Sequence, residues 1–230
     1  MESSPIIYSH NFGSFTFNIT TSVITQWVII LVLGIGSFLL TRNLKLKPGK
    51  LQAALEKLYQ MIYNLVENTM GSVYLSFLPY IGTLMVYLLV LNFLGLIGFK
   101  PPTQDLSVTI AFAIITFLVV NINAIKKNGI ADYGKSYMHP VAFMLPINIM
   151  EKLVLPVSLS LRLFGNMVAA TIVLDLLYTK LGGINMFAQL GLPVVAHVYF
   201  DLFDGTIQML VFSMLTMINI KVTADEIKKN

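Results

Sequence analysis

Long apolar runs, each close to or above the length of a membrane-spanning helix, set the strongest limit on how this chain can fold. The first run, residues 23–40, is interrupted only by Thr25, Gln26 and Ser37. A helix needs about 20 apolar residues to cross the hydrocarbon core of a bilayer. Only 11% of the 230 residues are charged, whereas about 25% is usual in soluble domains. We therefore expect an all-α membrane protein.

The hydropathy pattern predicts about five membrane crossings and one amphipathic surface helix within a single domain, residues 1–230. The surface helix is expected where apolar residues recur at helical spacing but charged residues interrupt them. The last two crossings are too long to stand upright, so we expect a tilted hairpin. The predicted segments are an extracytoplasmic N-terminal segment at 1–20, crossings at 21–41, 76–98 and 106–125, the surface helix at 50–72, long tilted helices at 140–179 and 185–220, and a cytoplasmic tail at 221–230.

Basic residues gather between and after the apolar runs, in residues 42–50, 126–135 and 221–229. Cytoplasmic ends of membrane helices are enriched in Lys and Arg. Five crossings satisfy this rule with the N-terminus outside and the C-terminus in the cytoplasm. The net charge of +4 is then explained by membrane orientation, and we expect no nucleic acid partner. The N-terminal residues lack the basic start of a cleaved signal, so we expect the first run to remain as an anchor.

Two classes of chemistry are excluded by what the sequence lacks. The chain has no cysteine, which excludes disulfides, thiol chemistry and cysteine-based zinc sites. It also has no glycine-rich phosphate loop followed by Lys and Ser or Thr. We therefore expect no cofactor, no metal and no catalytic residue on this chain.

The least expected residue is Arg162, which lies far from either end of its apolar stretch. An arginine in the middle of a membrane costs at least ~2.5–3.5 kcal/mol, and its guanidinium stays protonated. It therefore needs an anion or a water-filled cavity. One interpretation is an internal ion pair with Glu151 or Asp175; the other is a functional site. Asn166 lies one helical turn from Arg162 on the same face, with the small residue Gly165 beside it.

The same predicted helix carries polar residues on a second face. Thr171 lies nine residues after Arg162, near the opposite face at about 100° per residue, and Asp175 lies one turn beyond Thr171. Arg162 and this pair therefore look in different directions. A conductor with two separate aqueous paths would need such a division.

The last predicted helix has a polar stripe of its own. Asp201, Asp204 and Gln208 fall within about two turns, and His197 lies one turn before Asp201. Ionised carboxylates in an apolar helix are costly unless water or a cation reaches them. This favours an ion path along the aspartates, with His197 as a candidate relay, although a lone histidine is more often a packed or interfacial residue. The alternatives are that the aspartates cap or bend the helix and that His197 is a packed residue.

The run Ser158–Met167, with sequence SLSLRLFGNM, resembles the signature of subunit a of bacterial F-type ATP synthases. This resemblance covers nearly the whole chain. Further segments that look like the family are Pro79–Thr83, Asn92–Leu96, Pro102–Leu106, Pro146–Glu151 and Thr206–Gln208.

The resemblance implies a non-catalytic, ion-translocating stator subunit in a bacterial cell membrane. Its partners would be a rotating c-ring, b-type peripheral stalk subunits and the wider ATP synthase complex. Two offset half-channels would carry H⁺ or Na⁺ to and from the ring carboxylates and couple ion flow to ATP synthesis. By position, Arg162 matches the family's essential arginine, Asn166 and Gln208 match its polar partners, and Glu151 matches an acidic residue on the cytoplasmic side.

The chain departs from the family pattern at two positions. Many bacterial members have a glutamate nine residues after the arginine, where this chain has Thr171. Some have a histidine seven residues before the matching glutamine, where this chain has Asp201. We expect Asp201, Asp204 or Asp175 to supply the carboxylate of the outer half-channel instead.

Two other functions are compatible with a polytopic membrane protein. A stand-alone secondary transporter or antiporter would also bury Arg and Asp near the midplane, but such folds often have two similar halves, and no internal repeat is visible. A non-conducting assembly subunit would explain the length and the basic loops but not Arg162.

Overall fold

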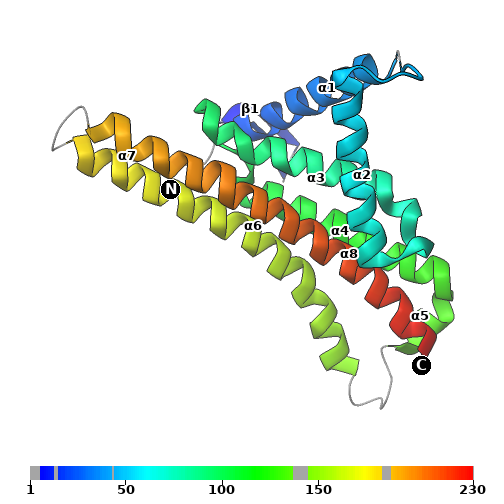
Figure 1. Ribbon diagram of the computed structural model, residues 1–230. Helices are drawn as coiled ribbons and strands as arrows, with labels where there is room; N and C mark the ends of the chain where they lie inside the picture. Colours follow the sequence, from blue (N-terminus) through cyan, green and yellow to red (C-terminus); the bar gives the residue numbers. More distant parts are fainter. Residues whose placement is uncertain (1–5, 13–14, 43, 137–144, 183–187, 230) are drawn as a thin grey trace.

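The computed structural model describes most of the chain and is almost entirely helical (Figure 1). The described residues are 6–12, 15–42, 44–136, 145–182 and 188–229.

The N-terminal part forms a hairpin that the sequence analysis did not predict. Strand β1 (Ile6–Phe12) pairs with β2 (Phe15–Thr20) in antiparallel register. Aromatic and β-branched residues in these strands suit extended structure. The hairpin leads directly into α1 (Thr21–Thr41), a span whose one fully buried residue is Ile29. Its exposed apolar side chains suit contact with lipid.

Helix α2 (Lys50–Met70) crosses the ends of the neighbouring helices at a steep angle (Figure 1). Its buried residues, Ile62, Val66 and Met70, are spaced by four and all lie in its second half. Such spacing makes one apolar stripe, as in a helix with one face against protein or membrane. This arrangement agrees with the predicted surface helix.

Two crossings follow, and short 3₁₀ turns flank them. The crossings are α3 (Leu78–Phe93) and α4 (Leu106–Asn128). The 3₁₀ turns are η1 (Ser72–Phe77), η2 (Leu94–Ile97) and η3 (Pro102–Gln104), and the short helix α5 (Ile130–Ser136) follows α4. Pro79 lies in the first turn of α3, where the missing N–H has no helical partner to lose.

The last two crossings form a long hairpin in which α6 runs beside α7 and α8 (Figure 1). Its elements are α6 (Leu145–Gly182), α7 (Ala188–His197), the π-helix η5 (Val198–Asp204) and α8 (Gly205–Lys229). At 1.5 Å per residue, α6 is about 57 Å long, well above the ~30 Å of a bilayer core. It carries Pro156, which weakens the helix ladder, and the ribbon bends in this first half. This hairpin of long helices was predicted from the sequence.

The structure differs from the predicted bounds in two respects. The last helix is not continuous, because π geometry interrupts it at residues 198–204. Helix α8 also includes most of the predicted tail and ends at Lys229. The predicted helix starts at 140–144 and 185–187 lie outside the described residues.

The core lies where α3, α4, α6 and α8 meet. Leu88, Ala113, Leu163 and Phe212 come from these four helices in turn, and each is at most 1% exposed. Within the described residues, five helices are long and apolar enough to cross a membrane. The all-α membrane fold is thus confirmed, and the N-terminal β-hairpin is the one addition of strands in the described part.

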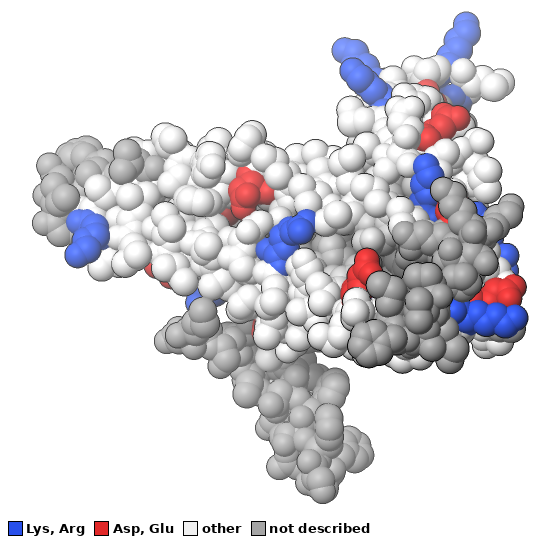
Figure 2. Space-filling model, turned by 90° about the horizontal axis from the view of Figure 1, so that it is seen from below, with Lys and Arg blue, Asp and Glu red and all other residues white. Residues whose placement is uncertain are grey.

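A polar cluster fastens α4 and α8 at the end of the bundle where both finish. Lys127 Nζ lies 2.7 Å from Asp225 Oδ1 and 2.6 Å from the hydroxyl of Tyr74, which itself donates to Asp225 at 2.8 Å. Lys127 also sits 4.5 Å from the centroid of the Tyr74 ring. In Figure 2, Lys and Arg gather mostly towards this end, and the opposite arm shows fewer of them on the face drawn.

Candidate functional site

Arg162 lies near the middle of α6 and is half-buried. None of the ion pairs or hydrogen bonds between described residues includes its side chain. Glu151 and Asp175, which are both exposed, stand about 16 Å and 20 Å away along the helix axis. The internal ion pair considered from the sequence is therefore not formed, and Arg162, halfway along a membrane helix, pairs with no anion in the part of the chain that the structure describes.

The residues Asn166 and Gln208 meet between α6 and α8. Asn166 Nδ2 donates to Gln208 Oε1 at 2.7 Å. The Gln208 side chain is 5% exposed, and its Nε2 is buried without an acceptor among the described residues. Leaving a buried donor unpaired costs about 1–3 kcal/mol. A polar pair with one orphaned donor thus lies one helical turn from Arg162.

Asp201 and His197 form a pair at the π-helix. His197 Nδ1 lies 2.7 Å from Asp201 Oδ2, and the Asp201 side chain is 6% exposed. The N-cap residue of η5 is His197, and it makes no side-chain hydrogen bond that caps this helix. Asp204 is half-buried. The wider turn of a π-helix changes the angular spacing of its residues. The two aspartates differ in their surroundings, since Asp201 is buried beside His197 and Asp204 is only half-buried.

The carboxyl of Asp201 packs against Gly95 in η2. Beside it, Asn92 is 1% exposed and its Nδ2 donates to the Gly205 carbonyl at 2.9 Å. Thr103 donates to Asn92 Oδ1 at 3.5 Å. Asn92–Leu96 resembles a segment of the family, but a role for Gly95 was not predictable, because nothing in the sequence links position 95 to position 201.

Thr171 has a partner that the sequence analysis missed. Gln104 Nε2 donates to Thr171 Oγ1 at 2.6 Å, and the Thr171 hydroxyl donates to the Met167 carbonyl at 2.9 Å. Gln104 lies in Pro102–Leu106, a segment noted for its resemblance to the family, which was the available signal. No side-chain partner is formed by Asp175 or Glu151 among the described residues.

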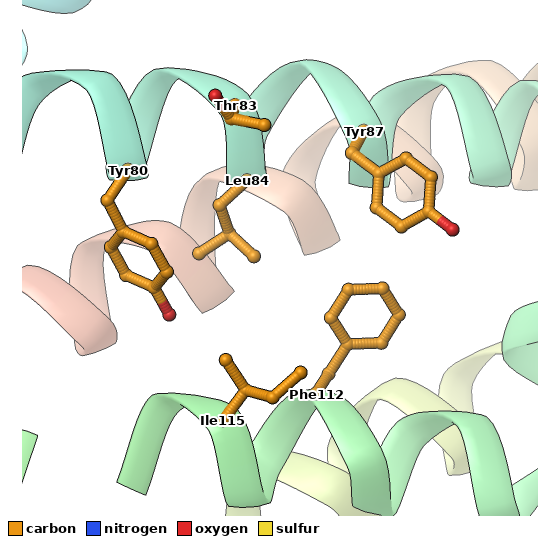
Figure 3. A pocket seen from close by; sticks show the side chains of 6 residues that line it. All are labelled: Tyr80, Thr83, Leu84, Tyr87, Phe112 and Ile115. Atoms are coloured by element: carbon orange, nitrogen blue, oxygen red, sulfur yellow. The ribbon is translucent and has the colours of Figure 1, made fainter. Parts of the chain in front are cut away.

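A shallow crevice between α3 and α4 lies apart from all these residues (Figure 3). Its volume is about 160 Å³, and its walls are Tyr80, Thr83, Leu84, Tyr87, Phe112 and Ile115. None of the predicted site residues reaches it. The described residues also contain no cluster of His, Asp and Glu that suits a metal ion.

Comparison with known proteins places this geometry in a family. Residues 23–221 match the protein family described as ATP synthase A chain, a span that includes Arg162, the Asn166–Gln208 pair and the His197–Asp201 pair. The chain belongs to this family.

Three relatives, each called ATP synthase subunit a, illustrate the similarity. The protein of Moorella thermoacetica is 38% identical over 86% of this chain and 88% of its own length. That of Bacillus subtilis is 34% identical over 90% of this chain and 92% of its own. The third, from Propionigenium modestum, is named as sodium ion specific and is 32% identical over 91% of this chain and 75% of its own. The chain is therefore a membrane subunit of an ATP synthase, and its family implies ion translocation.

Proposed function

We propose that this chain is the ion-conducting stator of an F-type ATP synthase. It provides two offset half-channels to the carboxylates of a rotating c-ring and so couples ion-motive force to ATP synthesis. The observation that carries the proposal is Arg162, a permanent cation midway along α6 with no partner among the described residues. An unpaired charge in the middle of a membrane is unfavourable. A partner anion on another subunit would offset this cost.

Arg162 acts as a fixed positive barrier. A ring carboxylate that passes it is held ionised by the nearby guanidinium, and a cation is kept from crossing directly between the half-channels. One charge crossing 100 mV is worth ~2.3 kcal/mol. A direct leak would therefore dissipate the free energy that the rotating ring collects from several ions. The Asn166–Gln208 bond fixes α6 against α8 beside this barrier.

The outer half-channel uses Asp201 with His197. Of the three candidate carboxylates, Asp201 is the buried one with a polar partner, at 2.7 Å. Asp204 is half-buried and Asp175 is exposed. His197 orients the Asp201 carboxylate. It also passes protons towards the ring or, where the ion is Na⁺, solvates the ion as it moves to the ring. Thr171, held by Gln104, adds hydroxyl and amide groups to this polar path.

The inner half-channel opens towards Glu151, which lies exposed near the start of α6. The end of the bundle that carries the Lys127–Asp225 pair faces the cytoplasm by the positive-inside rule, and the N-terminal hairpin lies outside. The membrane is that of a bacterial cell. Peripheral stalk subunits of the b type hold the chain against the ring, and ATP chemistry takes place elsewhere in the complex.

A disulfide between this chain and the ring tests the proposal in the whole complex. The chain has no cysteine, so a single Gly165→Cys is unambiguous, and a Cβ at Gly165 would meet nothing within 4 Å. Paired with a cysteine next to the ring carboxylate, it should form a disulfide on oxidation. ATP-driven ion uptake into inverted vesicles should then stop, and a reductant should restore it.

The matched control is Leu163→Cys, two residues away but 1% exposed in the core. It should form no disulfide with the same ring variant. If Leu163→Cys reacts and Gly165→Cys does not, the face of α6 that carries Arg162 does not meet the ring.

A further inference from the structure

The outer end of α3 and the π-helix approach each other so closely that one position has no room for a side chain. A Cβ placed on Gly95 would lie 2.5 Å from Asp201 Oδ1, 2.6 Å from its Cγ and 2.8 Å from Oδ2. All three atoms of the carboxyl group therefore rest over the Gly95 backbone. Any residue other than glycine at 95 must displace Asp201.

A second glycine makes the same approach from the other side. A Cβ on Gly205 would lie 3.0 Å from Asn92 Cβ, and the Gly205 carbonyl accepts the Asn92 amide at 2.9 Å. Small residues at facing positions let helix backbones pack closely. Gly95 and Gly205 together keep η2 and η5 in contact at the place where Asp201 is buried.

The Asp201 carboxyl is held from two sides. His197 contacts Oδ2 from one helical turn earlier, and the ring of His197 lies 5.9 Å from that of Tyr178 in α6. Gly95 closes the remaining side from η2. The Asp201 carboxyl group therefore lies in a narrow space between the His197 ring and the backbone of Gly95.

We propose that Gly95 is a positioning residue of the ion path, because its missing side chain leaves the narrow space that directs the Asp201 carboxylate towards His197. This inference rests on the proposed function, in which Asp201 carries ions through the outer half-channel. Gly95 touches no ion itself and acts through Asp201. Misplacing a reacting group by about 1 Å can cost on the order of 100-fold in rate.

The test is passive ion conduction through vesicles from which the catalytic head has been removed, divided by the amount of this chain assembled in the membrane. Gly95→Ala should lower conduction at least ~10-fold with unchanged assembly. The control is Gly82→Ala in α3, the helix just before η2, whose Cβ would meet Ile62 at an ordinary 3.7 Å. It should conduct within about twofold of wild type.

A double-mutant cycle separates positioning from mere packing. In the Asp201→Ala background the crowding atoms are gone, so adding Gly95→Ala should change conduction by less than about twofold. Wild-type conduction by Gly95→Ala, or a further tenfold loss in the Asp201→Ala background, would overturn the inference.

The two proposals fail differently. If Asp201→Ala alone conducts like wild type, the role of Asp201 in the proposed function is wrong. The inference about Gly95 then fails with it, whereas a loss of conduction in Asp201→Ala together with wild-type conduction in Gly95→Ala overturns the inference alone.

Discussion

Arg162 and Lys127 show two treatments of a cation in one membrane protein. Lys127 has an anion at 2.7 Å, a hydroxyl at 2.6 Å and an aromatic face at 4.5 Å. Arg162 has no partner among the described residues, although its charge cannot be lost by deprotonation. Lys127 is explained by the fold itself, whereas Arg162 needs a partner that the fold does not supply.

Replacing Asp201 and Asp175 one at a time distinguishes these two candidates for the outer carboxylate. Asp201→Asn should lower the initial rate of ATP-driven ion uptake by on the order of tenfold or more, because a positioned proton-transfer group contributes at least that much. Asp175→Asn should stay near wild type, since Asp175 is exposed and without a side-chain partner in the described part of the chain. A large loss for Asp175→Asn with normal uptake for Asp201→Asn would assign the outer carboxylate to Asp175.

The sequence was informative about single residues wherever a charged or polar side chain interrupts an apolar run. Arg162, Asp201 and Gln208 could be selected in this way, since membrane burial makes each of them costly. Gly95 could not be selected, because its importance lies in a contact with a residue more than a hundred positions later. Gln104 was missed for the same reason, its partner being Thr171 on α6.

At the scale of elements, hydropathy predicted the crossings because each must be apolar over its length. The π-helix at 198–204 was not predictable, since a local change from α to π geometry leaves little trace in an apolar pattern. The N-terminal hairpin was missed although its strands, IIYSHNF and FTFNIT, are rich in aromatic and β-branched residues, because two short strands give a weak signal and a two-stranded hairpin is only marginally stable by itself.

The cluster at the ends of α4 and α8 should stabilise the fold modestly. Side-chain exposures of 30% for Lys127 and 42% for Asp225 limit the ion pair to about 1 kcal/mol or less. Tyr74 is 5% exposed, so Tyr74→Phe should remove roughly another 1 kcal/mol through its lost hydrogen bonds. We expect Lys127→Ala and Asp225→Ala each to lower the thermal midpoint of the detergent-solubilised complex.

Adding the second substitution should lower the midpoint little further, because the two residues share one interaction. Lys135→Ala is the matched control. Its pair with Asp132 is 3.8 Å long, with side-chain exposures of 77% and 64%, and we expect no measurable shift. Additive losses for Lys127→Ala and Asp225→Ala would show that the cluster does not act as a unit.

At the scale of the whole molecule, charge is distributed by end and by depth. Most basic residues gather at one end, where α4 and α8 finish (Figure 2), as the positive-inside rule predicts for a cytoplasmic face. The long hairpin of α6, α7, η5 and α8 carries two groups of polar residues away from that end: Arg162 with the Asn166–Gln208 pair, and the His197–Asp201 pair. This division suits an ion path that is interrupted by one fixed cation.

The most direct test of that cation is ATP-driven ion uptake into inverted membrane vesicles, comparing wild type with Arg162→Ala, with and without added sodium. Wild type should accumulate ions and Arg162→Ala should not, at equal amounts of assembled complex, and dependence on sodium would identify the ion. If Arg162→Ala accumulates ions as well as wild type, Arg162 is not the barrier between two half-channels and the central claim is wrong.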